Sequence, residues 1–262
     1  MCPWHMTDRG HSHGRRGAVG NPQDLRRGPL GSGAVASEPR ATPSFLESLS
    51  ELERDALRAA WHATRWDTGE LLMRRGDPAD SAIVLLSGSV KIHTITSEGA
   101  DVVLGFSGPG DLLGEVSAVR SASRSASVTA MEAVEGVEIP VRGMRAFLGD
   151  HPRAALALLD LALARLYVAD TRRIEFATSE SLARVAGRLV ELCERFGVPR
   201  DDGAVEVGLP IGQEELASWS ASSRESTVRA LRTLRNLGLV ETSPRRFTVL
   251  DLDGLRAHAA RL

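Results

Sequence analysis

The chain has 262 residues, of which 42% are hydrophobic and 25% charged, and its formal net charge at pH 7 is −2. These values are typical of a globular protein with one large or two modest domains. They exclude a protein that binds nucleic acid through an overall basic charge, so any DNA-binding signal must be local.

The cysteines and the hydropathy pattern exclude further classes. Cys2 and Cys193 are too few for an iron–sulfur cluster, lack the spacing of a zinc site and do not predict a disulfide framework. No stretch approaches the roughly 20 apolar residues of a membrane span, and the N-terminal sequence lacks the apolar segment of a signal peptide. We therefore expect a cytoplasmic protein without membrane association.

The first segment, residues 1–42, is rich in Gly, Arg, Pro, Ser and His and shows no apolar periodicity. Such a segment cannot bury enough apolar surface to offset the entropy of ordering it, so we predict a disordered tail. Its His5, His11 and His13 could bind a metal, but a solvated tail is the simpler interpretation of this composition. We therefore predict no metal site.

Residues 43–150 predict a short helix followed by a β-rich domain. Leucines in helical register favour a helix over residues 45–63. From residue 66 to residue 141, short apolar segments alternate with glycine-centred turns, which is the pattern of a sandwich or barrel-like β-roll. The predicted strands are Leu71–Met73, Ile83–Leu86, Val90–Ile95, Val102–Phe106, Ser127–Ala130 and Val137–Ile139.

A long helix is predicted beyond Pro152. After a polar position at Asp170, its apolar pattern continues with Ile174 and Ala177. A narrow apolar seam on a helix of this length favours pairing with a second copy of the same helix, although packing against its own β-roll is an alternative. The seam leucines are Leu156, Leu159, Leu163 and Leu166.

The C-terminal third begins with a predicted helix over Ser181–Phe196 and a short apolar patch over Val205–Leu209. Two short helices separated by a tight turn follow, and then a β-rich stretch, Leu239–Leu250. Two short helices with a complementary apolar face are the helix-turn-helix arrangement. The β-rich stretch after them predicts a wing.

Local signals define the two helices. Leu216 and Trp219 share one face of the first helix, and small residues make the turn. Ser222, with Glu225 three positions on, predicts a capping box that begins the second helix, and Gly238 ends it. The predicted buried stripe of the second helix is Val228, Leu231 and Leu234.

The other face of the second helix carries side chains suited to DNA. Arg224 lies in the first turn, which enters the major groove in this motif, where arginine can donate to guanine and a carboxylate can accept from cytosine. Arg232 and Arg235 lie toward the flanks and better suit phosphate, and Arg245 and Arg246 tip the wing. A solvated face is the alternative for any one arginine, whereas the set within this motif favours DNA contact. The rest of this face consists of Glu225, Ser226, Arg229 and Thr233.

The Ser-Arg-Glu-x-x-x-Arg run at residues 223–229 resembles the Crp/Fnr family of transcription regulators, and the similarity covers residues 45–250. The resemblance implies that Ser223 contacts phosphate. Gly212 stands where the family often has a Thr or Ser helix cap, and glycine still caps passably. The residues that the resemblance assigns to base reading are Arg224, Glu225 and Arg229.

A candidate anion site lies in the β-rich segment. A phosphate buried inside a β-roll requires a fixed cation and free donors. Arg124 can supply a bidentate fork and Ser125 an N–H and a hydroxyl, while Glu115 can accept from a ribose hydroxyl, as acidic residues do in other nucleotide sites. Gly114 lets the backbone approach a ligand closely. From the residues alone, a structural ion pair between Glu115 and Arg124 is the favoured alternative.

The family resemblance changes this weighting. Gly-Glu, a short loop and then Arg-Ser-Ala is similar to the family's phosphate-binding cassette, although the loop at residues 116–123 is one residue shorter. The family's purine contacts come from a Thr–Ser or Thr–Asn pair on the long helix, where this chain has Ala169 and Asp170, with Thr171 next. Cyclic AMP is therefore the favoured effector, with cyclic GMP, another nucleotide or no effector as alternatives. The implied ligand-binding residues are Gly114, Glu115, Arg124, Ser125, Asp170 and Thr171.

These features predict an α+β chain with an N-terminal double-stranded β-helix, the cyclic-nucleotide-binding β-roll, then a long dimerisation helix and a C-terminal winged helix-turn-helix. The predicted function is that of a transcription regulator, an activator, that binds palindromic duplex DNA as a homodimer. The resemblance implies RNA polymerase as a further partner, and no cofactor is required. The predicted segments are a tail over 1–42, the β-roll over 43–150, the dimerisation helix over 151–178 and the DNA-binding domain over 179–262.

Three alternatives stay open at this point. One is a regulator of the same fold that needs no ligand or responds to another effector. A haem sensor is the second, because His93 lies on a predicted strand, although a lone strand histidine is more often structural. A nucleotide-regulated enzyme is the remote third, because the sequence shows no Gly-rich phosphate loop, His–Cys metal cluster or nucleophile–base set. We therefore predict no catalytic residues.

Overall fold

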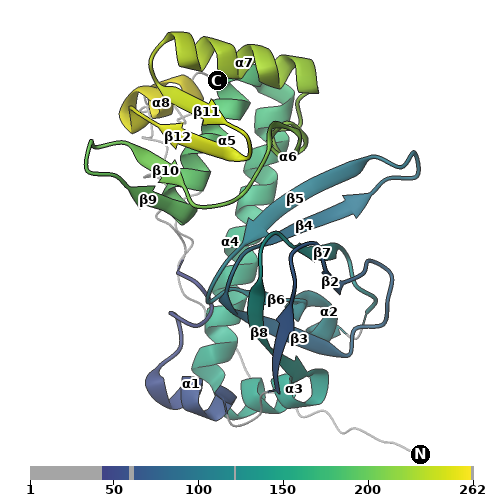
Figure 1. Ribbon diagram of the computed structural model, residues 1–262. Helices are drawn as coiled ribbons and strands as arrows, with labels where there is room; N and C mark the ends of the chain where they lie inside the picture. Colours follow the sequence, from purple (N-terminus) through teal and green to yellow (C-terminus); the bar gives the residue numbers. More distant parts are fainter. Residues whose placement is uncertain (1–42, 59–61, 121, 261–262) are drawn as a thin grey trace, which may run out of the picture. The chain divides into compact units, whose positions relative to one another are not determined.

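The computed structural model describes residues 43–58, 62–120 and 122–260 (Figure 1). The predicted tail over residues 1–42, with its three histidines, lies outside the described residues. The predicted fold class is confirmed, because a β-roll comes first, a long helix follows it, and a winged helix-turn-helix comes last.

The predicted helix over residues 45–63 is wrong at both ends. Helix α1 spans only Glu51–Arg58, residues 45–48 form turns, and strand β1, His62–Trp66, begins inside the predicted helix. β1 pairs antiparallel with β8, Val134–Pro140. A pairing between segments so far apart in sequence overrides the local helical pattern, because β structure depends on cross-strand partners more than on local propensity.

The β-roll consists of two four-stranded antiparallel sheets with the orders β1-β8-β3-β6 and β2-β7-β4-β5. Every strand predicted from the sequence is present, whereas β1 was not predicted. A strand segment is also expected from the sequence to end at Leu113–Val116, and β6 ends at Leu113. A short helix, α2, spans Glu115–Arg120 directly after β6. The remaining strands are β2 Leu71–Met73, β3 Ser81–Ser87, β4 Val90–Ile95, β5 Asp101–Ser107, β6 Leu112–Leu113 and β7 Ser127–Ala130.

Both faces of β3 are buried, and its side chains alternate between two apolar clusters of the roll. One joins side chains of both sheets and includes Ile83, Leu85 and Val128. The other joins β3 and β8 to α1, to α3 (Val141–Asp150) and to the start of the long helix. Burying apolar side chains of this size stabilises the fold by about 1.5–3 kcal/mol each. The second cluster therefore fixes the long helix against the roll.

The long helix, α4, spans Pro152–Thr178 and has two apolar faces. Ala154 and Leu158 are buried against the roll, and Leu161 is partly buried in the same cluster. The four seam leucines lie elsewhere on the helix and are between 54% and 65% exposed. The predicted seam is therefore separate from the face that packs on the roll.

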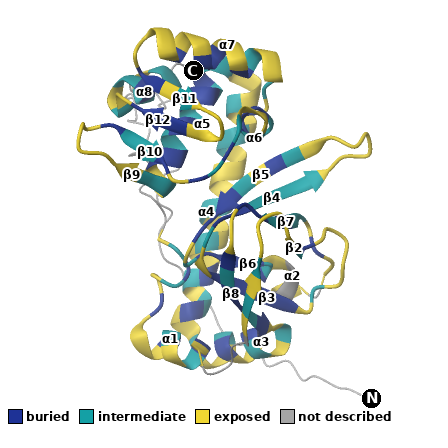
Figure 2. Ribbon diagram, viewed as in Figure 1, coloured by how far each residue is buried: buried dark blue, intermediate teal, exposed yellow. Residues whose placement is uncertain are grey.

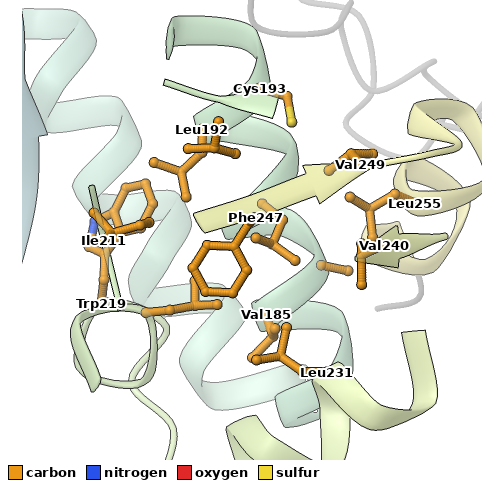
Figure 3. Close-up of a cluster of buried hydrophobic side chains, with 14 of the residues drawn as sticks. Val185, Leu192, Cys193, Ile211, Trp219, Leu231, Val240, Phe247, Val249 and Leu255 are labelled. Atoms are coloured by element: carbon orange, nitrogen blue, oxygen red, sulfur yellow. The ribbon is translucent and has the colours of Figure 1, made fainter. Parts of the chain in front are cut away.

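The C-terminal domain packs helices around a small sheet of order β11-β12-β10-β9. Figure 3 shows its core, in which Phe247 of β12 is surrounded by Val185, Leu192, Leu231 and other buried side chains. Gly238, with a φ of +71°, follows the last turn of α7, as predicted. The elements are α5 Ser181–Phe196, β9 Gly197–Pro199, β10 Val205–Val207, α6 Gln213–Trp219, α7 Arg224–Asn236, β11 Val240–Ser243, β12 Arg246–Val249 and α8 Leu252–Ala259.

The described residues include no helix that is long and apolar enough to cross a membrane.

Cys193 is buried in the C-terminal core, and burial raises the pKa of its thiol to about 12. A thiol with this pKa is almost entirely protonated at neutral pH, so Cys193 acts as a small apolar core residue.

Candidate effector pocket and DNA interface

Gly114 and Arg124 lie against each other in the β-roll. Gly114 separates β6 from α2 and has a φ of +74°, a conformation that favours glycine. A Cβ at this position would lie 2.3 Å from Arg124 Nη1 and 2.8 Å from Met73 Cε. The absence of a side chain at Gly114 is therefore what makes room for the arginine head group.

The guanidinium of Arg124 is buried and only partly hydrogen-bonded. The residue is 7% exposed, and its Nη2 donates to Asp80 Oδ1 and Ser81 Oγ, both at 3.2 Å. Its Nη1 is buried and has no hydrogen-bond partner among the described residues. The backbone of Arg124 is held by the β2–β3 turn, because its N–H donates to Asp77 and its carbonyl accepts from Gly76, each at 2.9 Å. A fixed cation with one unused donor is what a buried anion requires.

Glu115 does not pair with Arg124. Its buried carboxylate forms an ion pair with Arg165 Nη1 of α4, and Arg165 Nη2 donates to the carbonyl of Leu112 at 3.1 Å. Arg165 was not predicted from the sequence. The available signal was a single charged side chain, that of Arg165, within the apolar stretch of α4 between Asp160 and Asp170. The ion pair joins the candidate pocket to the long helix.

The three other predicted ligand residues are Ser125, Asp170 and Thr171, and their side chains have other surroundings than the buried Arg124 guanidinium. Ser125 is exposed beside Arg124. Asp170 is exposed and pairs with Arg173, the two charged atoms lying 3.2 Å apart, while Thr171 is half-buried. Among the described residues, Arg165 supplies the contact from α4 to Glu115. Gly114 and Arg124 lie together, while the ligand-binding roles of Ser125, Asp170 and Thr171 stay predictions.

His93 has both ring nitrogens in hydrogen bonds. Nδ1 lies 2.6 Å from Asp101 Oδ1, and Nε2 lies 2.9 Å from Thr129 Oγ1. Burial raises the pKa of the Asp101 carboxyl, but hydrogen bonds with Lys91 and His93 outweigh it and leave that pKa below its ordinary value. A haem iron would have to replace one of these bonds, so the arrangement is that of a structural histidine.

The helix-turn-helix begins at Gly212, whose N–H donates to Glu215 Oε2 at 2.9 Å. The predicted cap of the second helix is wrong by one residue. Ser223, and not Ser222, is the N-cap of α7 and accepts from Ser226 N–H at 3.1 Å. Ser222 instead donates to the carbonyl of Ser220 at 3.2 Å, because the turn extends one residue further than predicted.

The buried stripe of α7 also differs from the prediction. Thr227, Ala230, Leu231 and Leu234 are buried, which is an i, i+3, i+4, i+7 stripe. Val228 lies off this stripe and is 42% exposed, so its predicted burial is wrong. Leu216 and Trp219 of α6 are buried as predicted.

The outward side of α7 carries the predicted base-reading residues, and Figure 2 colours that side as exposed. Arg224 pairs with Glu214 of α6 at 3.1 Å, with both side chains largely exposed. Arg229 Nη2 donates to Ser226 Oγ at 2.8 Å, and Arg229 Nη1 lies 4.0 Å from Glu225 Oε2. Exposed contacts of this kind are weak, so the arginines can exchange them for DNA.

Comparisons with known proteins agree with both halves of this description. The family model of the cyclic nucleotide-binding domain matches residues 63–151, and the model of the Crp-like helix-turn-helix domain matches residues 183–258. The chain belongs to the Crp/Fnr family of transcription regulators.

Three similar proteins show the extent of this Crp/Fnr likeness. A CRP-like cAMP-activated global transcriptional regulator of Mycobacterium tuberculosis is 28% identical over 191 residues, which cover 73% of this chain and 85% of that protein. The cyclic AMP receptor protein of Thermus thermophilus is 27% identical over 205 residues, covering 78% and 91%. The solved structure of a CRP-family transcriptional regulator, also from Thermus thermophilus, has a TM-score of 0.63 at 26% identity and covers 75% of this chain and 96% of that one.

The wing of this Crp/Fnr chain is the β11–β12 hairpin. Its two predicted DNA-contacting arginines both contact the body of the domain. Arg245, with a φ of +55°, donates to the carbonyl of Pro210 at 2.7 Å, and Arg246 pairs with Glu206 of β10 at 3.2 Å. The exposed Arg232 lies on α7.

Helix α6 contacts the free edge of β5, the outer strand of its sheet. Ser218 Oγ accepts from Val103 N–H at 2.8 Å and donates to the carbonyl of Asp101 at 3.0 Å. One serine hydroxyl thereby satisfies two backbone groups that a neighbouring strand would otherwise occupy.

Arg172 of α4 strengthens this contact. It donates to the carbonyl of Leu104 at 2.9 Å, pairs with Glu191 of α5 at 2.8 Å and lies over the ring of Trp219 at 5.1 Å. Phe106 of β5 meets Trp219 edge-on, with ring centroids 5.1 Å apart. Burial lowers the pKa of the Arg172 guanidinium, and Glu191 opposes that shift. Trp219 Nε1 and Arg172 Nε are buried without hydrogen-bond partners among the described residues, which costs about 1–3 kcal/mol each.

Proposed function

We propose that this Crp/Fnr regulator binds palindromic duplex DNA as a homodimer under the control of a cyclic nucleotide, with cyclic AMP as the first candidate. The observation that carries the effector proposal is the buried Arg124 guanidinium, whose Nη1 has no protein partner among the described residues and lies against Gly114. Burying a charged donor without a partner is costly, and a phosphate would satisfy it.

The other pocket residues supply matching chemistry. Ser125 follows Arg124 and can donate its N–H and hydroxyl to the same phosphate. Glu115 can accept from a ribose hydroxyl if it exchanges its bond with Arg165. Because Arg165 is part of α4, a ligand at Glu115 would change a contact of the long helix. Asp170 and Thr171 stay candidate purine contacts.

Names of relatives support cyclic AMP among the nucleotides. The Mycobacterium tuberculosis relative is described as cAMP-activated, and the Thermus thermophilus relative as a cyclic AMP receptor protein. A regulator that needs no nucleotide is the second candidate, favoured by the Glu115–Arg165 ion pair, which already joins the roll to α4.

Isothermal titration separates the two candidates. We expect wild-type protein to bind cyclic AMP more tightly than cyclic GMP, and Arg124→Leu to lose at least about 100-fold in affinity, because a buried charged hydrogen-bond pair is broken. Arg75→Ala is the control, because Arg75 is an exposed arginine nearby that donates to Thr94. Absence of binding by the wild type would favour the ligand-independent regulator, and unchanged affinity in Arg124→Leu would refute the pocket.

The homodimer proposal is supported by the seam leucines. In the single chain they are more than half exposed, and together they form an apolar stripe on α4. A second copy would bury them at about 1.5–3 kcal/mol for each side chain. We expect Leu163→Glu to weaken self-association at least about 100-fold in sedimentation experiments, because both copies carry the change. Leu52→Glu, on the exposed face of α1, is the matched control, and a monomeric wild type would contradict the proposal.

A dimer would present two α7 helices about one DNA turn, roughly 34 Å, apart in successive major grooves. Arg224, Glu225 and Arg229 would contact base edges. The effector must bind the DNA-competent state and the other state differently, or it regulates nothing. Trp219 Nε1 and Arg172 Nε are buried donors without partners among the described residues. Their unsatisfied hydrogen bonds lower the free-energy cost of separating α6 from β5. The residues proposed to contact phosphate are Ser223, Arg232, Arg245 and Arg246.

Gel-shift experiments on a palindromic duplex, with and without cyclic AMP, test the regulated step. We expect tighter binding with the nucleotide and a complex containing two chains. Transcription in vitro with RNA polymerase then distinguishes activation, which we propose, from repression. Equal DNA binding with and without nucleotide would favour constitutive regulation.

A further inference from the structure

Arg184 of α5 connects three parts of the DNA-binding region through one guanidinium. Nε donates to the carbonyl of Ser220 at 3.0 Å, and Nη2 donates to the carbonyl of Ala221 at 3.3 Å and to Ser222 Oγ at 3.4 Å. These acceptors belong to three of the four residues in the turn between α6 and α7, and the fourth is Ser223, the N-cap of α7. Nη1 donates to the carbonyl of Ser179, the C-cap of α4.

The turn that Arg184 contacts is strained. Ala221 has a φ of +48°, whereas turns in helix-turn-helix motifs often contain glycine. A left-handed residue with a Cβ costs about 1–2 kcal/mol. The carbonyls of Ser220 and Ala221 lie at the C-terminal end of α6, where helix carbonyls lack intrahelical partners and a cation is favourable. Arg184 therefore offsets the strain at the point where it arises.

The other end of the arginine is fixed as well. Its guanidinium lies over the ring of Phe176 of α4, with Cζ 5.7 Å from the ring centroid. The bond to Ser179 and this contact belong to the end of α4, and the bonds to residues 220–222 belong to the turn that precedes α7. A change in the angle between α4 and α5 would therefore displace the turn.

We propose that Arg184 is a positioning residue for DNA binding, which holds the α6–α7 turn against the end of α4 and so sets the angle at which α7 presents its arginines. Its planar fork serves several carbonyls at once, which a lysine ammonium matches poorly. The role depends on the family's DNA binding and not on the identity of any effector.

The competing role is direct contact with a DNA phosphate. Arg184 lines an open groove of about 480 Å³ together with Ser226 and Arg229 of α7. A phosphate contact would weaken binding to every duplex alike and reduce the dependence of affinity on salt by about one counterion. A positioning residue would instead weaken binding to the preferred sequence more than to random duplex.

The experiment uses the full chain and a duplex selected by the wild type from a random library. We expect Arg184→Ala to weaken binding to the selected duplex about 10- to 100-fold, with a smaller loss on random duplex and an unchanged salt slope. Arg184→Lys should restore only part of the loss. Arg200→Ala is the control, because Arg200 pairs with Asp202 in the β9–β10 turn of the same domain.

Rescue provides the decisive measurement. Glycine adopts positive φ without steric cost, so Ala221→Gly should have little effect alone and should recover at least about threefold in the Arg184→Ala background. Hydrogen exchange at the amide of Ser222, which donates to the carbonyl of Ala217 at 3.0 Å, should accelerate in Arg184→Ala. Absence of rescue together with a lower salt slope would establish the phosphate contact and overturn the proposal. Unchanged affinity in Arg184→Ala would also overturn it, whereas failure of the wild type to select any duplex would contradict DNA binding itself.

Discussion

The β-roll and the recognition helix both rely on arginine, but they hold it in opposite ways. Arg124 is buried, its backbone is fixed on both sides, and one of its terminal nitrogens has no partner among the described residues. Arg224 and Arg229 are exposed and contact side chains that are themselves exposed. The buried arginine has already lost its water, so it is organised for one small anion. The exposed pair can adapt to a long polymer.

Among the substitutions that leave both arginines in place or test the exposed side, the largest effect is expected from closing the space beside Arg124. Gly114→Ala places a Cβ 2.3 Å from Arg124 Nη1, so the head group must move. We expect nucleotide affinity to fall by about 1.5–3 kcal/mol, the value of a hydrogen bond to a charged group. Titration calorimetry measures it.

Gly99→Ala is the matched control for this change. Gly99 has a φ of +84°, but a Cβ there meets nothing within 4 Å. Both variants should lose about 1–2 kcal/mol of unfolding free energy from backbone strain, and Gly114→Ala should lose more because its Cβ also crowds Arg124 and Met73. Only Gly114→Ala should weaken nucleotide binding. Equal nucleotide affinity in Gly114→Ala and Gly99→Ala would contradict the proposal that Arg124 binds the nucleotide.

An intermediate effect is expected on the exposed side of the comparison. Arg229→Ala should weaken binding to the preferred duplex by about 1–3 kcal/mol and relax specificity at one base position. Arg232→Ala should weaken binding to all duplexes equally and reduce the salt slope by about one. Fluorescence anisotropy at several salt concentrations distinguishes the two. Identical behaviour of both variants would show that Arg229 contacts phosphate.

The smallest effect is expected from the partner of an exposed arginine. Glu214→Gln removes the ion pair with Arg224, and exposed pairs contribute little to stability. We expect the unfolding free energy to change by less than about 0.5 kcal/mol and DNA affinity to rise up to a few-fold, because a negative charge near the phosphates is lost. Asp253→Asn, which removes an exposed partner of Arg256 on α8, is the control. A large loss of unfolding free energy would contradict the prediction, because it would show that the exposed Glu214–Arg224 ion pair contributes strongly to stability.

The sequence predicted best where the signal was local. Helix α5 has the predicted bounds, Ser181–Phe196, because its apolar side chains recur at helical spacing over four turns. Gly238 ends α7 because a left-handed residue is needed there. In both places a few neighbouring residues determine the structure.

The failures required information from distant residues or from backbone geometry. Strand β1 exists because it pairs with β8, and that partner lies beyond any local window. The N-cap of α7 is Ser223 because the turn before it, in which Ala221 has a positive φ, extends one residue further than predicted. No residue type in that turn indicates a positive φ. Arg165 is part of the candidate pocket because α4 passes that side of the roll, a packing arrangement that spacing within the helix does not specify. The roles of the remaining site residues stay predictions until ligand and DNA are tested.

The position of Ser218 on the edge of β5 has a consequence for solution behaviour. An outer strand with free N–H and C=O groups can add a strand from another molecule, which leads to aggregation. While α6 remains in place, Ser218 covers the groups of Asp101 and Val103. Any motion large enough to lift α6 from the roll exposes that edge, so conformers with a displaced DNA-binding domain should be the ones most prone to precipitate at high concentration.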